Sequence, residues 1–105
     1  MEKTSWTELH ENCTKTLTSL KENVSKLGTL YSSQDTSPTY DQLCQIVSKD
    51  IRKLKRQTNY LEDCLDKEQK SEVLDDKEFS NRCVVIGTFR REISQLEQQY
   101  KYYNI

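Results

Sequence analysis

Residues 40–65 read YDQLCQIVSKDIRKLKRQTNYLEDCL and decide the fold. Apolar and small residues recur at every third or fourth position: Tyr40, Leu43, Cys44, Val47, Ile51, Leu54, Thr58, Leu61 and Leu65. This period is that of an amphipathic α-helix, since a half-buried strand alternates at every second residue. The stretch therefore predicts a helix of about seven turns with one buried face.

Two further segments repeat this period. The first carries Trp6, Leu9, Cys13, Leu17, Leu20, Val24, Leu27 and Tyr31. The third carries Phe79, Cys83, Ile86, Phe89 or Arg90, Ile93, Leu96, Tyr100 and Tyr103, with Gly87 inside it as a site of close helix approach or of simple tolerance. Helix-start signals are Ser5 with Glu8, Pro38 after a serine, and Asp75 with Glu78. We expect helices at about 5–31, 38–67 and 75–103.

Short polar links at 32–37 and 67–72 join the three segments, so they pack most simply as an antiparallel up-down-up three-helix bundle. We predict an all-α single domain over residues 1–105, an elongated rod that is monomeric. Hydrophobic residues make up 33% of the chain and charged residues 31%, a balance that narrow apolar stripes explain better than disorder does. No stretch approaches the roughly 20 apolar residues of a membrane span.

Other classes of function find little support in the composition. Two glycines and one proline leave almost no material for phosphate-binding loops, and a net charge of −1 offers no general attraction for nucleic acid. The one histidine, His10, has no nucleophile set in a turn beside it and is expected to lie solvated on a helix surface. We therefore expect no enzyme and no cofactor.

Four cysteines stand far apart and form no C-x-x-C pair: Cys13, Cys44, Cys64 and Cys83. The opening residues lack the apolar run of a secretory signal, so reduced, buried cysteines are the favoured interpretation. A disulfide framework and a zinc site that begins with His10 and Cys13 are the alternatives, although the zinc site would need two further ligands from other helices.

One charge run and one exposed aromatic are the candidate partner-binding residues. The run holds Arg52, Lys53, Lys55 and Arg56, which fan over the outer face of the second helix. These cations either pair with Asp50, Glu62 and acids of neighbouring helices, or form a basic ridge for an acidic partner or an anionic membrane. Near the end of the third segment, Tyr102 is out of register with the apolar stripe and should be exposed.

Three features resemble the N-terminal regulatory domain of Qc-type SNAREs, in particular syntaxin-8-like proteins with their plant vacuolar relatives and, more distantly, syntaxin-6-like proteins. The first is the Ser5-Trp6 start, and the second is the helix over 46–65 with basic residues between apolar ones. The third is the acidic opening at 74–82 with Glu78-x-x-x-Arg82, followed by Phe89-Arg90-Arg91-Glu92-Ile93. The chain departs from a complete SNARE because neither the heptad segment nor the membrane anchor fits within it.

The resemblance implies a non-catalytic regulatory domain of vesicle traffic and membrane fusion, at the cytosolic face of endosomal, vacuolar or Golgi membranes. Its implied partners are other SNAREs, tethering-complex or adaptor segments, or the protein's own SNARE motif, while the full-length protein is membrane-anchored. The alternative is a coiled-coil subunit of a cytoskeletal, kinetochore or tethering assembly, which would form obligate oligomers.

Overall fold

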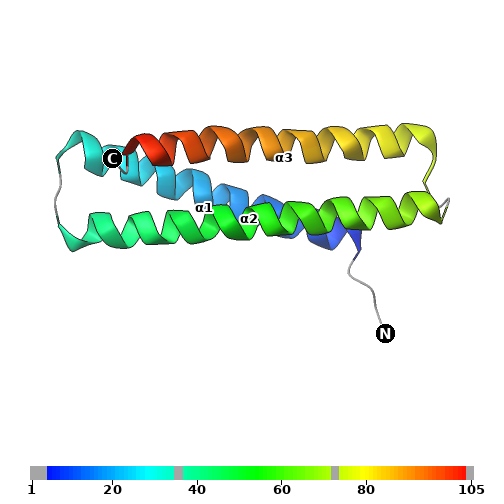
Figure 1. Cartoon of the computed structure of the whole chain (residues 1–105), viewed down its shortest axis with the longest axis horizontal. Coiled ribbons are helices and arrows are strands. Elements are labelled where there is room, and N and C mark those ends of the chain that lie inside the picture. The colour runs from blue at the N-terminus through cyan, green and yellow to red at the C-terminus, as the bar shows by residue number, and fades with distance from the viewer. Residues whose placement is uncertain (1–4, 35–36, 72–73, 104–105) are drawn as a thin grey trace.

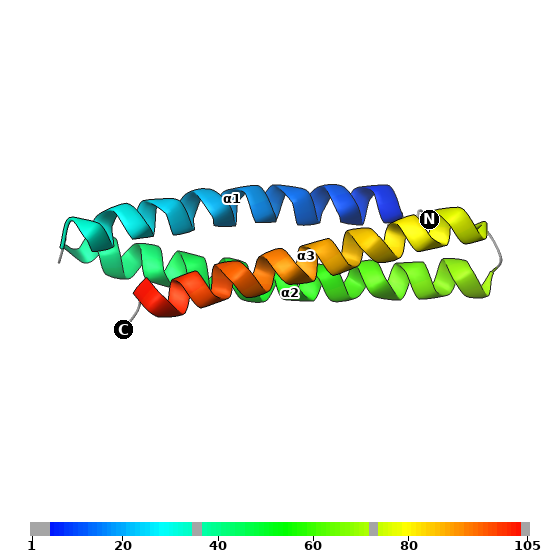
Figure 2. The same cartoon turned by 90° about the horizontal axis from the view of Figure 1, so that it is seen from above.

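The computed structural model describes residues 5–34, 37–71 and 74–103. It contains α1 (Trp6–Ser32), α2 (Pro38–Lys70) and α3 (Asp76–Tyr103), and each helix packs against the other two. Figure 1 shows α3 lying along α2, with α1 behind them both, and Figure 2 shows α3 running obliquely to the other two helices. The rod measures 54 × 28 × 16 Å. The predicted all-α, up-down-up three-helix bundle is confirmed.

The helix starts are built as their residue types require. The Ser5 hydroxyl accepts a hydrogen bond from the Glu8 backbone N–H at 3.3 Å, and the Asp75 carboxylate accepts one from that of Glu78 at 2.7 Å. These acceptors satisfy N–H groups that have no partner in the first turn of a helix. Pro38 occupies the first turn of α2, where its missing N–H costs nothing.

α2 continues to Lys70, three residues beyond the end that we expected at 67. Lys67 and Lys70 lie in its last turn, where cations interact favourably with the helix dipole, and Glu68 bonds to Arg82 of α3. A polar sequence is therefore compatible with three more helical positions here. Of the expected polar links, residues 35–36 and 72 lie outside the described residues, and so do residues 1–4 at the opening of the chain.

The core is one continuous row of side chains along the rod. Its most completely buried members are Leu20, Leu27, Leu54, Leu61, Val47, Thr58 and Cys13. The hydroxyl of Thr58 donates to the Leu54 carbonyl at 2.8 Å, so this buried polar group is satisfied within its own helix. All three helices contribute to this core from a single chain.

The buried face of α3 differs from our expectation at one position. Cys83 is exposed, and the side chain of Arg82 is only 17% exposed in its place. The inward positions follow the heptad-like series Phe79, Arg82, Ile86, Phe89, Ile93 and Leu96, which leaves Cys83 on the flank. Phe89 rather than Arg90 is the buried alternative. Nothing lies within 4 Å of a Cβ built on Gly87, so this glycine is merely tolerated.

Candidate partner-binding surfaces

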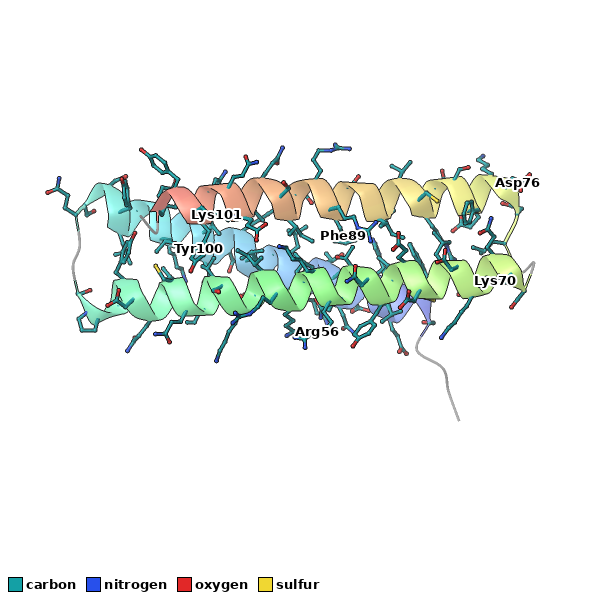
Figure 3. All side chains as sticks on the ribbon, in the orientation of Figure 1. Arg56, Lys70, Asp76, Phe89, Tyr100 and Lys101 are labelled. Carbon is teal, nitrogen blue, oxygen red and sulfur yellow. The ribbon has the colours of Figure 1, made fainter. Side chains whose placement is uncertain are left out.

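The five candidate residues do not form one surface. Arg52, Lys53 and Arg56 are exposed on α2, and none of them makes an ion pair within residues 5–34, 37–71 and 74–103. Figure 3 shows Arg56 on the side of α2 that faces away from α3. Lys55 turns toward α3 instead, where its Nζ lies 2.8 Å from Glu97 Oε2.

Of the expected pairing of these cations, only the part with acids of neighbouring helices holds, for Lys55 with Glu97, and none of the four pairs with Asp50 or Glu62 within the described residues. Glu62 pairs with Arg90 of α3 through two bonds of 2.9 and 3.0 Å, and the bound guanidinium holds the pKa of Glu62 below its ordinary value. Asp50 makes no ion pair within the described part of the chain. Glu62 and Glu97 are thus paired with cations across the boundary between α2 and α3, and Arg52, Lys53 and Arg56 are exposed to solvent.

A tyrosine cluster, consisting of Tyr31, Tyr102 and Tyr103, closes one end of the rod. Each pair of rings has its centroids 5.4–5.6 Å apart, the range of favourable aromatic contacts. Tyr102 is 59% exposed, as predicted, and Tyr31 is 40% exposed although its spacing suggested a core position. The Tyr40 hydroxyl donates a hydrogen bond to the Tyr103 carbonyl and ties α2 to this end.

The aromatic clamp, consisting of Trp6, His10, Arg82 and Phe89, lies toward the opposite end, between the start of α1 and the first half of α3. The Arg82 guanidinium lies 4.8 Å from the centre of the Trp6 ring, and it also bonds to Glu78 at 3.1 Å and to Glu68. His10 stacks on Trp6 and meets Phe89 edge to face, so it is half-buried rather than solvated as we expected. The apolar stripes of the sequence placed Trp6 and Phe89 in the core, but nothing in the sequence indicated that His10 would pack against them.

An α1–α2 groove, with a volume of about 530 Å³, opens between the end of α1 and the start of α2. Its apolar floor consists of Leu30, Leu43 and Ile46, and Ile46 is 46% exposed. Its polar rim consists of Asn23, Lys26, Thr29, Thr39 and Gln42. The sequence did not reveal this site, because Ile46 lies outside the apolar stripe of its helix and meets Leu30 of α1 only in the packed bundle.

The cysteines are free and do not share one environment. Cys13 and Cys44 are buried, Cys64 is half-buried and Cys83 is exposed, so the expectation that all four are buried is wrong at Cys83. Burial raises the pKa of the Cys13 and Cys44 thiols, since a buried thiolate is poorly solvated. In the described part of the chain, no three His, Cys, Asp or Glu side chains lie close enough to hold a metal ion.

Comparison with known proteins gives no relative: no protein-family model, no curated protein and no solved structure matches this chain. As far as the three helices are described, none is both long and apolar enough to span a membrane.

Proposed function

We propose that this chain is the N-terminal regulatory domain of a Qc-type SNARE and that it binds helical partner segments without catalysing a reaction. The observation that carries the proposal is the α1–α2 groove. Its partly exposed apolar floor lies between two antiparallel helices, the arrangement that receives a third amphipathic helix. Tethering-complex segments, adaptor segments, other SNAREs and the protein's own SNARE motif all offer such a helix.

The clamp adds support to the resemblance on which this proposal rests. Two of the resembling features are the tryptophan at the first helix start and the Glu-x-x-x-Arg pattern at the third. In the bundle Glu78 and Arg82 form an ion pair, and Arg82 lies over Trp6. The two features thus serve one structural purpose, because together they join the starts of α1 and α3.

The closed core favours a self-contained module over a subunit of an obligate coiled-coil assembly. Leu20, Leu27, Leu54 and Leu61 are fully buried within one chain. An obligate subunit would be expected to leave such a stripe for a partner chain. Sedimentation equilibrium of the reduced chain separates the two possibilities: a monomer of 12.4 kDa fits the proposal, and a stable oligomer contradicts it.

Binding to SNARE-motif peptides tests the proposed function directly. Fluorescent peptides of the Qa, Qb, Qc and R classes would be titrated with the chain, and binding followed by anisotropy. At least one class should bind, and Ile46→Asp should weaken it at least tenfold, because a carboxylate would be buried under the apolar face of the ligand. Val84→Asp is the matched control, since Val84 is 68% exposed on α3 and does not line the groove.

Two results would count against this function. One is the absence of binding to every class, and the other is an equal loss in the Ile46→Asp and Val84→Asp variants. Circular dichroism of both variants must show unchanged helix content for the comparison to hold.

A further inference from the structure

The outward face of α2 is strongly basic although the chain as a whole is slightly acidic. Exposed residues spaced three or four apart lie on one face of a helix, and on α2 this face carries Lys49, Arg52, Lys53, Arg56, Tyr60, Asp63, Lys67 and Lys70. We call this set the α2 ridge. It holds six cations and one acid, whereas the chain has 16 cations against 17 acids.

The cations of the ridge are free of ion pairs in the described part of the chain and can therefore interact with an anionic partner. None of the six makes an ion pair within the residues that the structure describes. The cations at the seams behave differently: Lys21, Lys55 and Arg90 pair with Glu92, Glu97 and Glu62 across helix boundaries. Glu62, Glu92 and Glu97 are therefore occupied at the helix boundaries. The acids of α2 nearest the ridge, Asp50, Asp63 and Asp66, form no ion pair in the described residues and are outnumbered by the six cations.

The shape of the ridge decides whether an acidic peptide helix or an anionic membrane surface is the better partner. It is the convex outer side of one helix, and it extends from Lys49 to Lys70 over about 32 Å. A peptide helix packs in the groove between two helices, where it can bury side chains on both of its flanks. A convex row of cations makes its best contact with an extended, nearly flat anionic surface.

Tyr60 lies in the middle of the ridge and is 53% exposed. A tyrosine suits the boundary between water and lipid, because its ring is apolar and its hydroxyl reaches the headgroups. We propose that the α2 ridge docks the rod lengthwise on an anionic membrane, with Tyr60 at the headgroup level. This contact is separate from the α1–α2 groove, and it does not depend on the proposed SNARE function.

Vesicle sedimentation tests the proposal. The chain would be mixed with vesicles of phosphatidylcholine containing about 30% phosphatidylserine, or with phosphatidylcholine alone, at several salt concentrations. We expect binding only to the anionic vesicles, and binding that falls as salt rises. Neutralising four ridge cations (Lys49→Gln, Arg52→Gln, Lys53→Gln and Arg56→Gln) should lower the partition coefficient roughly 600-fold, because each basic residue near such a surface contributes roughly fivefold.

The matched control changes the net charge equally on other faces. It carries Lys26→Gln, Lys77→Gln, Arg91→Gln and Lys101→Gln, four exposed cations that also lack ion pairs in the described ranges. This variant should retain most of the binding. If the fourfold ridge variant loses helix content, the double variant Arg52→Gln/Arg56→Gln replaces it, with an expected loss of roughly 25-fold.

Tyr60→Ala should weaken vesicle binding severalfold, whereas Tyr102→Ala at the end of the rod should not. The proposal is overturned if the chain ignores anionic vesicles at low salt, or if the ridge and control variants lose binding equally. It is also overturned if polyglutamate binds the ridge while vesicles do not, since that result would assign the ridge to an acidic protein. Unchanged binding of Tyr60→Ala would remove the tyrosine from the contact.

Discussion

At one end of the rod an arginine lies across a tryptophan, and at the other end three tyrosine rings pack against one another. The clamp buries its parts: Trp6 is 9% exposed, and the Arg82 side chain is 17% exposed and bonded to two carboxylates. The tyrosine cluster leaves Tyr31 and Tyr102 largely open. Both ends use aromatic side chains, but only the clamp contributes substantial burial.

Burial predicts that the two ends differ in their contribution to stability. Trp6→Ala should lower the free energy of unfolding by about 3–5 kcal/mol, because it removes a buried ring and leaves a cavity under Arg82. Tyr102→Ala should cost less than about 1 kcal/mol, since the ring is mostly in solvent. Urea unfolding followed by circular dichroism measures both. Equal losses would mean that the tyrosine cluster is as firmly packed as the clamp.

Replacing Arg82, the cation of the clamp, should have a smaller effect on stability than replacing Trp6. Arg82→Gln should lower the free energy of unfolding by about 1–2 kcal/mol, because it removes the contact with Trp6 and leaves Glu68 and Glu78 without their shared partner. Arg90→Gln is the control at the exposed pair with Glu62 and should cost less than about 1 kcal/mol. If Arg90→Gln cost more than Arg82→Gln, the ion pairs of the clamp would not be its main source of stability.

The two glycines test how tightly the tyrosine end is packed. Gly87→Ala should stabilise the chain by about 1 kcal/mol, because α3 gains helix propensity and the new methyl meets open space. Gly28→Ala gains the same propensity, but its Cβ would lie 2.9 Å from the Tyr103 hydroxyl, so the ring must move. We expect a smaller gain or a net loss.

A double-mutant cycle isolates the contact between Gly28 and Tyr103. In a Tyr103→Ala background, Gly28→Ala should recover the gain of about 1 kcal/mol that Gly87→Ala shows. The same effect of Gly28→Ala in both backgrounds would show that the Tyr103 ring moves aside without cost.

The sequence predicts the parts of this molecule that depend on local pattern. The stripe of α2, Ser5 with Glu8, and Asp75 with Glu78 each follow from residue type and spacing along one helix. Which of two neighbouring residues faces the core cannot be predicted from the sequence where the packing of another helix decides it. Both Arg82 and Cys83 stand at helical spacing from Phe79 and Ile86, and only the presence of Trp6 and Glu68 across the bundle places Arg82 inward.

The candidate surfaces follow the same rule. Exposure of Arg52, Lys53, Arg56 and Tyr102 could be predicted from their register on a single helix. The turn of Lys55 toward Glu97 could not, because the pairing depends on how far α3 is shifted along α2. The α1–α2 groove was missed for the same reason, since Leu30 and Ile46 belong to different helices and meet only in the packed bundle.

The last prediction concerns the hydrogen bond that ties α2 to the tyrosine end. Tyr40→Phe removes the bond from its hydroxyl to the Tyr103 carbonyl and should cost about 0.5–1.5 kcal/mol at neutral pH. The pKa of Tyr40 is raised above its ordinary value mainly by burial and to a smaller extent by nearby acidic groups. The folded chain therefore holds this phenol neutral at a pH where the unfolded chain has begun to ionise it.

Because the pKa of Tyr40 is higher in the folded chain than in the unfolded chain, the free energy of unfolding falls as the pH rises into the alkaline range. The contribution of Tyr40 is complete below the ordinary tyrosine pKa of about 10, and it is lost as the pH rises through the higher pKa of the folded chain. Urea unfolding at neutral pH and at several alkaline values should show a decline in stability that is smaller in Tyr40→Phe than in the native chain. Identical declines in both would mean that the alkaline sensitivity comes from other groups and that this bond contributes none of it.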